Sequence, residues 1–256
     1  MAENSHGRRY INLSNKRFDN RIYEETRSGM GYKPMSAFWC SLESLDNDYY
    51  SAWDEMYGEI IDPDENGLIY ATTVEINSNT YVLNPASDEV LLEGLQKFIS
   101  KTERKLTAVE KRKLMVELIK TKKNMPNIEH VICQIDLPQD IDVIEKVFAN
   151  YNSDGQNSEE VYENLLENVR GAFVENFSGV EVTDYALGND DISEFEGNVY
   201  YFEGMKKRKD PKYTGDFGFW EMHSLAIFDT NCLDIINEIE IDQAKRLREL
   251  EEDERE

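Results

Sequence analysis

The stretch GYKPMSAFWCSLESLDNDYYSAW, residues Gly31–Trp53, gathers two tryptophans and three tyrosines in a chain that is otherwise acidic and polar. Its central part, SAFWCSL (36–42), has the aromatic content that is typical of a β-strand. The part after it places aromatic and apolar residues at helical spacing and ends at the turn-forming cluster DPDENG (62–67). The stretch therefore predicts a strand followed by a helix, and it concentrates an aromatic surface that needs an explanation.

Further strand patterns lie on both sides of this stretch. RRYINLS (8–14) predicts a first strand, and LIYATTVEI (68–76) with YVLN (81–84) predicts a hairpin across a short turn. Extended segments are also expected in VICQIDLP (131–138), GVEVTDYAL (179–187) and FGFWEMHSLAIFD (217–229). The strands thus occur in both halves of the chain.

Helical patterns occupy the middle of the chain, at residues 87–123, 142–151 and 158–177. No internal repeat and no Gly/Ser linker separates them from the strands. The sequence therefore predicts one α+β domain over residues 1–236, with a basic helical insertion around 101–175. Residues 237–256 are expected to form a charged C-terminal helix or tail.

The composition limits the classes of partner. With 52 acidic and 28 basic residues the net charge is -24, so the field of the whole molecule repels nucleic acids and anionic membranes. The three cysteines are far apart and form no C-x-x-C pair, which argues against a disulfide framework or a zinc ribbon. The N-terminus lacks the apolar core of a signal peptide. We expect a soluble protein in the cytoplasm of a bacterium or an infected host cell, with no membrane partner.

Two basic segments contrast with this acidity. Residues 101–123 contain nine Lys or Arg and three Glu, and residues 205–212, MKKRKDPK, form a second cluster. One interpretation is a solvated helix face whose charges face the acidic body of the protein. The other is a patch that guides a macromolecular substrate, either a nucleic acid or an acidic protein, to the molecule.

Several familiar signatures are absent from the sequence. It has no Gly-rich phosphate loop, no G-x-G-x-x-G, no G-x-S-x-G and no H-E-x-x-H motif. The three histidines, His6, His130 and His223, have no partner at metal-ligand spacing, so no metal site is expected. These absences argue against a P-loop ATPase, a Rossmann enzyme, an α/β-hydrolase and a zincin.

Three segments follow one another in an order that resembles a known family. KPMSAFWCS (33–41) with SAW (51–53), SGVEVTDY (178–185) and FWEMHSLAIF (219–228) resemble the motif series of the ADP-ribosyltransferase-like proteins. The resemblance is to divergent bacterial and phage members, which carry a Lys-Pro-x-Gly-Leu-Trp-x-Ser strand and a C-terminal Trp-Asp/Glu-x-x-Ser strand. It covers about residues 8–103 and 177–236, although the Lys-Pro strand here has one additional residue and no glycine.

The resemblance implies a split antiparallel sheet flanked by helices, with NAD as a substrate and no metal. It implies Glu221 as the catalytic carboxylate, which stabilises the oxocarbenium-like ribose formed when the nicotinamide bond breaks. It also implies NAD contacts from Phe38, Trp39, Ser41, Trp220 and Ser224, and from Arg9 or Asn12 on the first strand. Aromatic stacking on the nicotinamide ring would then explain the aromatic stretch.

Two functions from different classes follow. The first is an NAD-dependent mono-ADP-ribosyltransferase that modifies a protein or a nucleic acid, such as a toxin, a defence factor or a phage factor, with an inhibitory or antitoxin partner. The second is a non-catalytic acidic protein on a degenerate fold of this kind, which mimics nucleic acid or inhibits a basic protein. The charge of -24 motivates the second function.

Overall fold

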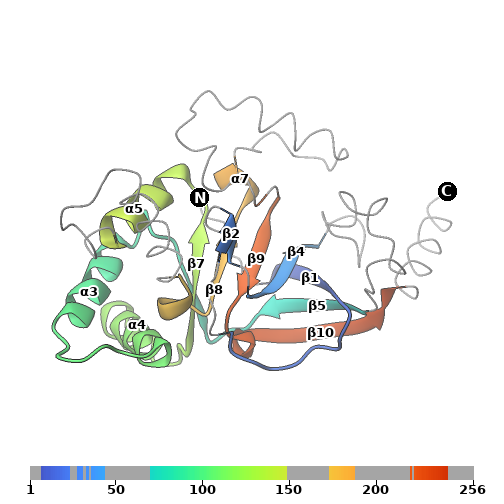
Figure 1. The fold of residues 1–256 in the computed structure, drawn as a ribbon, viewed down its shortest axis with the longest axis horizontal. Helices are drawn as coiled ribbons and strands as arrows, with labels where there is room; N and C mark the ends of the chain where they lie inside the picture. The colour runs from blue at the N-terminus through green and yellow to red at the C-terminus, as the bar shows by residue number, and fades with distance from the viewer. Residues whose placement is uncertain are drawn as a thin grey trace.

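The computed structural model describes residues 7–23, 28–30, 33–34, 36–43, 70–148, 173–187, 220 and 222–241. These residues form an α+β fold around an eight-stranded sheet (Figure 1). Its strands are β1 (Arg9–Ser14), β4 (Phe38–Leu42), β5 (Tyr70–Ile76), β6 (Thr80–Leu83), β7 (His130–Ile135), β8 (Gly179–Val182), β9 (Ser224–Ile227) and β10 (Leu233–Glu240). The helices are α3 (Glu89–Ser100), α4 (Ala108–Lys123), α5 (Pro138–Phe148), the short α7 (Asp184–Leu187) and the 3₁₀ turn η2 (Thr230–Cys232). A separate two-stranded sheet pairs β2 (Ser28–Met30) with β3 (Lys33–Pro34).

The main sheet has the order β10-β5-β1-β4-β9-β8-β7-β6 and contains two parts of different character. The six strands from β10 to β8 are antiparallel at each pairing. The strands β6, β7 and β8 are parallel to one another. The described strands therefore form one continuous mixed sheet, whereas the family resemblance implied a split antiparallel one.

Helices cover one face of the parallel part, because parallel strands need long crossover connections. The helices α3, α4 and α5 lie on one side of β7 (Figure 1). Leucines of α3, Met115 and Ile119 of α4, and Val131, Cys133 and Ile135 of β7 share one hydrophobic core. A second core on the opposite face of the sheet contains Tyr10, Phe38 and Cys40. Both faces of the central strands are thus buried.

The predicted hairpin of residues 68–76 and 81–84 is wrong, although both strands exist. Strand β5 pairs with β1 and β10, while β6 lies at the other edge of the sheet, parallel to β7. The connection is instead held by η2, since the N–H of Asn77 donates to the carbonyl of Cys232 at 3.0 Å. The side chain of Thr80 donates to Asn77 Oδ1 at 2.6 Å. The turn therefore sends the chain from one arm of the sheet to the other, and β5 lies across the direction of β7 (Figure 1).

Two predicted segment boundaries differ from the structure. The range 101–175 was expected as a basic helical insertion, with one extended segment at 131–138. That segment contains β7, which lies in the main sheet between β8 and β6. Residues 237–240, expected to begin a C-terminal helix or tail, are the last residues of β10 and pair with β5. In these ranges, β7 and the end of β10 thus belong to the main sheet, and α4 and α5 belong to the helical layer that covers it.

Helix α4 carries most of the basic segment 101–123, and part of its charge is used inside the protein. Lys111 forms an ion pair with Glu175, and Lys123 Nζ lies 2.7 Å from Asp88 Oδ1. The buried guanidinium of Arg112 donates to the carbonyl of Val174 at 2.8 Å. Lys101, Lys105, Lys113 and Lys122 are exposed. The second cluster, residues 205–212, lies outside the described residues.

No helix in the part of the chain that the structure describes has the length and apolar composition needed to cross a membrane.

Candidate functional site

The structure brings three predicted motifs together on neighbouring strands. Strand β4, from the Lys-Pro segment, lies between β1 and β9. Ser41 of β4 is in register with Ile11 of β1 on one side and with Ser224 of β9 on the other. Segments that are more than 180 residues apart in the sequence thus meet at the centre of the antiparallel part.

Side chains of the predicted set contact one another across these strands. The rings of Trp39 and Trp220 lie 4.8 Å apart between centroids and are tilted by 59°. The amide of Asn12 donates a hydrogen bond of 2.6 Å from Nδ2 to the carbonyl of Trp39. The hydroxyl of Ser224 donates to the carbonyl of Met222 at 2.9 Å. Trp39 therefore links β1 to the segment that leads into β9.

A cleft of about 270 Å³ opens beside β1 and the start of β4. Three of the predicted NAD-contacting residues, Asn12, Phe38 and Trp39, line it. The other lining residues come mainly from the segment after β1; they are Leu13, Ser14, Lys16, Arg17, Phe18, Asp19, Arg21, Tyr23 and Ala37. The cleft therefore combines aromatic side chains with polar and charged ones.

Asn12 has hydrogen-bonding capacity that the described residues leave unused. The residue is only 7% exposed, and its Oδ1 atom is buried without a hydrogen-bond partner in the part of the chain described. A buried acceptor without a donor costs about 1–3 kcal/mol. A side chain of this kind on the lining of a cleft is suited to bind a ligand that carries an N–H or O–H donor.

The cleft is locally basic in a protein whose net charge is -24. Three cations, Lys16, Arg17 and Arg21, line it together with one carboxylate, that of Asp19. The guanidinium of Arg17 lies over the ring of Tyr70 at 5.0 Å from its centroid, and its Nη1 atom lies 3.2 Å from Glu238 Oε1, which offsets part of its charge. An anion is therefore attracted to this cleft although the field of the whole molecule repels it.

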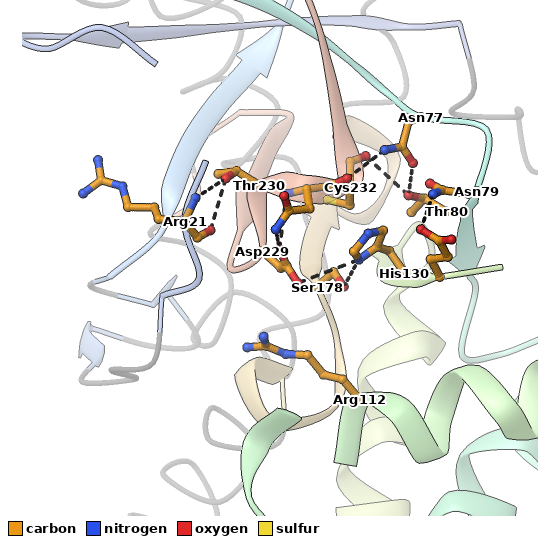
Figure 2. A network of polar contacts seen from close by, with 12 residues as sticks. Arg21, Asn77, Asn79, Thr80, Arg112, His130, Ser178, Asp229, Thr230 and Cys232 are labelled. Atoms are coloured by element: carbon orange, nitrogen blue, oxygen red, sulfur yellow. Dashed lines mark hydrogen bonds and ion pairs between the residues drawn. The ribbon is translucent and has the colours of Figure 1, made fainter. Parts of the chain in front are cut away.

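The segment that carries these cations is held by its backbone. The N–H of Arg21 donates to Thr230 Oγ1 at 2.8 Å, and the N–H of Thr230 donates back to the carbonyl of Arg21 at 3.1 Å. The N–H of Tyr23 donates to the carbonyl of Phe228 at 2.6 Å. Figure 2 shows the side chain of Arg21 pointing away from the network to which its backbone is bound. The guanidinium is thus presented from a fixed backbone.

The remaining predicted residues do not line this cleft. Arg9 lies at the start of β1 and forms an ion pair with Glu75 of β5 at 3.2 Å. Ser41, Ser224 and Trp220 are buried within the sheet and its core. The predicted catalytic residue, Glu221, lies outside the described residues. Of the two alternatives for the first strand, Asn12 is therefore the residue at the cleft.

The structure also contains a buried polar cluster that the sequence analysis missed. Glu181 of β8 is fully buried, and its carboxylate accepts hydrogen bonds from Tyr10 Oη at 2.6 Å and from Gln134 Nε2 at 2.9 Å. His223 Nε2 lies 2.7 Å from Glu181 Oε1. The N–H of His223 donates to Asp184 Oδ1 at 3.0 Å. A single acidic residue in the apolar strand GVEV was the available signal, because a carboxylate is rarely buried without partners.

The environment of His223 favours its charged form. Burial by itself lowers the pKa of His223, but the hydrogen bond and negative charge of Glu181, together with the charge of Asp184, raise the pKa above its ordinary value. Arg8, whose Nη1 lies 3.8 Å from Glu181 Oε1, opposes this effect. The cluster is therefore a buried ion pair with additional hydrogen bonds.

The ion pair of His223 with Glu181 predicts that the stability of the fold decreases as the pH rises. Because the pKa of His223 is raised in the folded state, its contribution is fully present below about pH 6.5 and is lost as the pH rises through the folded value. Urea unfolding at a series of pH values is expected to show that the wild type loses up to about 1.4 kcal/mol per pH unit in this window relative to His223→Gln.

His130 provides a control, because its pKa is shifted in the opposite direction from that of His223. Burial lowers the pKa of His130, although the charges of Asp229 and Glu129 oppose it. The wild type is therefore expected to lose stability relative to His130→Gln as the pH falls through about 6.5. Equal pH profiles for the wild type and His223→Gln would contradict the buried ion pair.

The surroundings of His130 resemble a catalytic triad in composition but not in geometry. Ser178 Oγ lies 3.4 Å and Asp229 Oδ2 lies 3.8 Å from the same atom, His130 Nδ1 (Figure 2). A serine–histidine–aspartate relay uses the two different ring nitrogens. The Oδ1 atom of Asp229 accepts from Asn231 instead. The network therefore joins β7, β8 and the turn after β9, and it does not activate Ser178.

Among the described residues, no group of three or more His, Cys, Asp or Glu side chains is arranged to hold a metal ion. No protein-family model matches the chain, and searches of curated proteins and of solved structures gave no match.

Proposed function

We propose that the protein is an NAD-dependent mono-ADP-ribosyltransferase that modifies a macromolecule. One observation carries the proposal: the predicted motifs of the first strand, the Lys-Pro strand and the late Trp-Glu strand lie on or lead into the adjacent strands β1, β4 and β9. The antiparallel part of the sheet, to which these strands belong, supports the finer proposal of a transferase-like core.

The cleft beside β1 and β4 supports NAD as the ligand. Phe38 and Trp39 offer aromatic surface for a flat ring, while Lys16 and Arg21 offer positive charge for phosphates. The third cation of the lining, Arg17, is paired with Glu238. Asn12 Oδ1 offers an acceptor for a ligand donor such as an amide or a ribose hydroxyl. The volume of about 270 Å³ is slightly below the usual range of about 300–1,000 Å³ for ligand sites, so part of the dinucleotide extends beyond the cleft.

The proposed reaction breaks the bond between C1′ of the ribose and the nicotinamide nitrogen. The bonding electron pair leaves with nicotinamide, and the sugar acquires oxocarbenium character. The carboxylate of Glu221 stabilises this positive charge and orients the attacking nucleophile. The nucleophile of the target forms the new bond to C1′ and loses its proton to solvent.

The test is incubation of the purified protein with NAD labelled in the ADP-ribose part, together with a cell lysate. Products are separated into protein and nucleic-acid fractions, and free ADP-ribose is measured as well. Label in one fraction supports transfer and identifies the substrate class. Absence of transfer, hydrolysis and NAD binding by a folded sample, over several lysates, contradicts the proposal.

A cleft variant tests whether NAD binds where we propose. Arg21→Gln is expected to weaken NAD binding by about tenfold or more, because a charge-assisted hydrogen bond to phosphate contributes about 1.5–3 kcal/mol. Isothermal titration calorimetry at two salt concentrations measures this, and the wild type should show the steeper loss of affinity with salt. Arg104→Gln is the matched control, because Arg104 is an exposed arginine that pairs with Glu110 outside the cleft. Equal affinities for the two variants contradict the assigned cleft.

The charge of -24 favours a second candidate, a non-catalytic protein that binds a basic partner through its acidic surface. The internal ion pairs of Lys111 and Lys123 agree with it, since they leave fewer basic groups for a polyanion. Such binding weakens steeply as salt increases. A protein that neither binds nor cleaves NAD but captures a basic protein in this salt-dependent way would favour this candidate.

A further inference from the structure

The segment that leads into β9 has two anchors, one on each side of position 221. On one side, the ring of Trp220 lies 4.8 Å from that of Trp39 of β4. On the other side, His223 contacts Glu181 through Nε2 at 2.7 Å and Asp184 through its backbone N–H at 3.0 Å. The segment is therefore attached to β4 before this position and to β8 and α7 after it.

Glu181 is a firm anchor because several elements hold its carboxylate. Tyr10 Oη of β1 donates to Oε1 at 2.6 Å, and Gln134 Nε2 of β7 donates to Oε2 at 2.9 Å. The carboxylate cannot move without breaking buried hydrogen bonds, which are costly to lose. The imidazole of His223 thus binds an acceptor whose position is set by the centre of the sheet.

We propose that Glu181 is a positioning residue, which fixes Trp220 and residues 222–224, on the two sides of position 221 in the sequence, by binding the imidazolium of His223. The catalytic consequence rests on the proposed function, because it requires Glu221 to act on NAD. The docking of the segment does not depend on the reaction. When the anchor is removed, the segment loses the contact of the His223 side chain with β8, while the backbone pairing of Ser224 with Val182 remains. A small displacement of a catalytic group lowers kcat strongly. The cleft residues on β1 and β4 are left in place, so KM changes little.

The anchor depends on the protonation of His223. Among the residues that the structure describes, the charged and titratable groups near it are Glu181 from β8, Asp184 from α7, Tyr10 from β1 and, through Glu181, Arg8 from the segment before β1. Two carboxylates and one guanidinium leave a negative environment for the imidazole. Deprotonation at high pH therefore removes the charge that binds the segment to Glu181.

The contact between Trp39 and Trp220 provides a readout that is independent of activity. Two tilted indole rings at this distance couple their electronic transitions and give a paired positive and negative band in the far-ultraviolet circular dichroism spectrum. Trp220→Phe identifies the band pair by removing it. Glu181→Gln is expected to diminish the band pair at neutral pH, and Asp234→Asn, which removes an exposed carboxylate of β10, is expected to leave it unchanged.

In the wild type, the band pair and kcat are expected to fall together as the pH rises, with one midpoint, and this dependence is expected to be absent in His223→Gln. Glu181→Gln is expected to lower kcat by about 100-fold with KM nearly unchanged. If Glu181→Gln does not fold, the pH series of the wild type and of His223→Gln provides the same test.

The outcomes separate this inference from the proposed function. A wild type that does not cleave NAD contradicts the function, and the band pair then decides the inference alone. A band pair that persists in Glu181→Gln and at high pH overturns the inference. A band pair that is lost while kcat stays unchanged in an active enzyme also overturns it, because the anchor is then structural only.

Discussion

Replacing Glu221 by glutamine is expected to lower the rate of NAD cleavage by about 10²- to 10³-fold, with little change in the thermal unfolding transition. Glutamine has nearly the same shape as glutamate but lacks the negative charge that stabilises the oxocarbenium-like ribose. The loss should appear in kcat and in kcat/KM alike, because the charge acts on the transition state more than on bound NAD. Release of labelled nicotinamide from NAD measures the rate directly.

The control for this prediction is Glu240→Gln, which removes an exposed carboxylate at the end of β10. It changes the net charge by the same amount and is expected to keep the wild-type rate. A Glu221→Gln variant with full activity would remove Glu221 from the mechanism. A wild type without any NAD cleavage would instead move the protein to the class of acidic binding proteins.

Replacing Asp140 by alanine is expected to destabilise the fold by about 3 kcal/mol or more, a large part of the 5–15 kcal/mol that is typical of a domain. Asp140 is fully buried in the first turn of α5. Its carboxylate accepts from the N–H groups of Asp136, Leu137 and Ala86 at 2.8, 2.7 and 2.8 Å. Alanine leaves these three donors without the acceptor that joins the start of α5 to the segment before α3.

Asp140→Asn separates the hydrogen bonds from the charge. Burial raises the pKa of Asp140 although the three backbone hydrogen bonds oppose it, so the buried charge is itself costly. Asparagine removes this cost and keeps one acceptor oxygen, and it is expected to lose less stability than alanine. Urea unfolding followed by circular dichroism measures both, with the exposed neighbour Gln139→Ala as the control. An Asp140→Ala variant as stable as Gln139→Ala would show that water replaces the carboxylate.

Local sequence patterns predicted the strands but not which strands pair with each other. The alternation in 68–76 and 81–84 predicted two strands correctly, but their short connection predicted a hairpin that does not form. Asn77 binds Cys232, a residue 155 positions away, and this contact sets the path of the turn. A pairing that depends on such a distant partner cannot be read from the spacing of the two strands.

Some residues of the candidate site were predicted from the sequence and others were not. Asn12, Phe38 and Trp39 were predicted as ligand contacts from the motifs, and they line one cleft. The cations Arg17 and Arg21 were not predicted, because the segment after β1 has no regular sequence pattern that would indicate its position relative to the sheet. Ser41 and Ser224 were predicted as ligand contacts but are buried between neighbouring strands.

Local alternation and composition were sufficient to predict the α+β class and most strands of the sheet, and the order of the three motifs can be read directly along the chain. Long-range packing was needed to establish that β1, β4 and β9 are neighbours, that β6 lies at the far edge of the sheet, and that Glu181 is a buried anion. An isolated carboxylate in a strand is most often on the surface. Its burial becomes favourable only when Tyr10, Gln134 and His223, from three distant segments, bring their donors to one point.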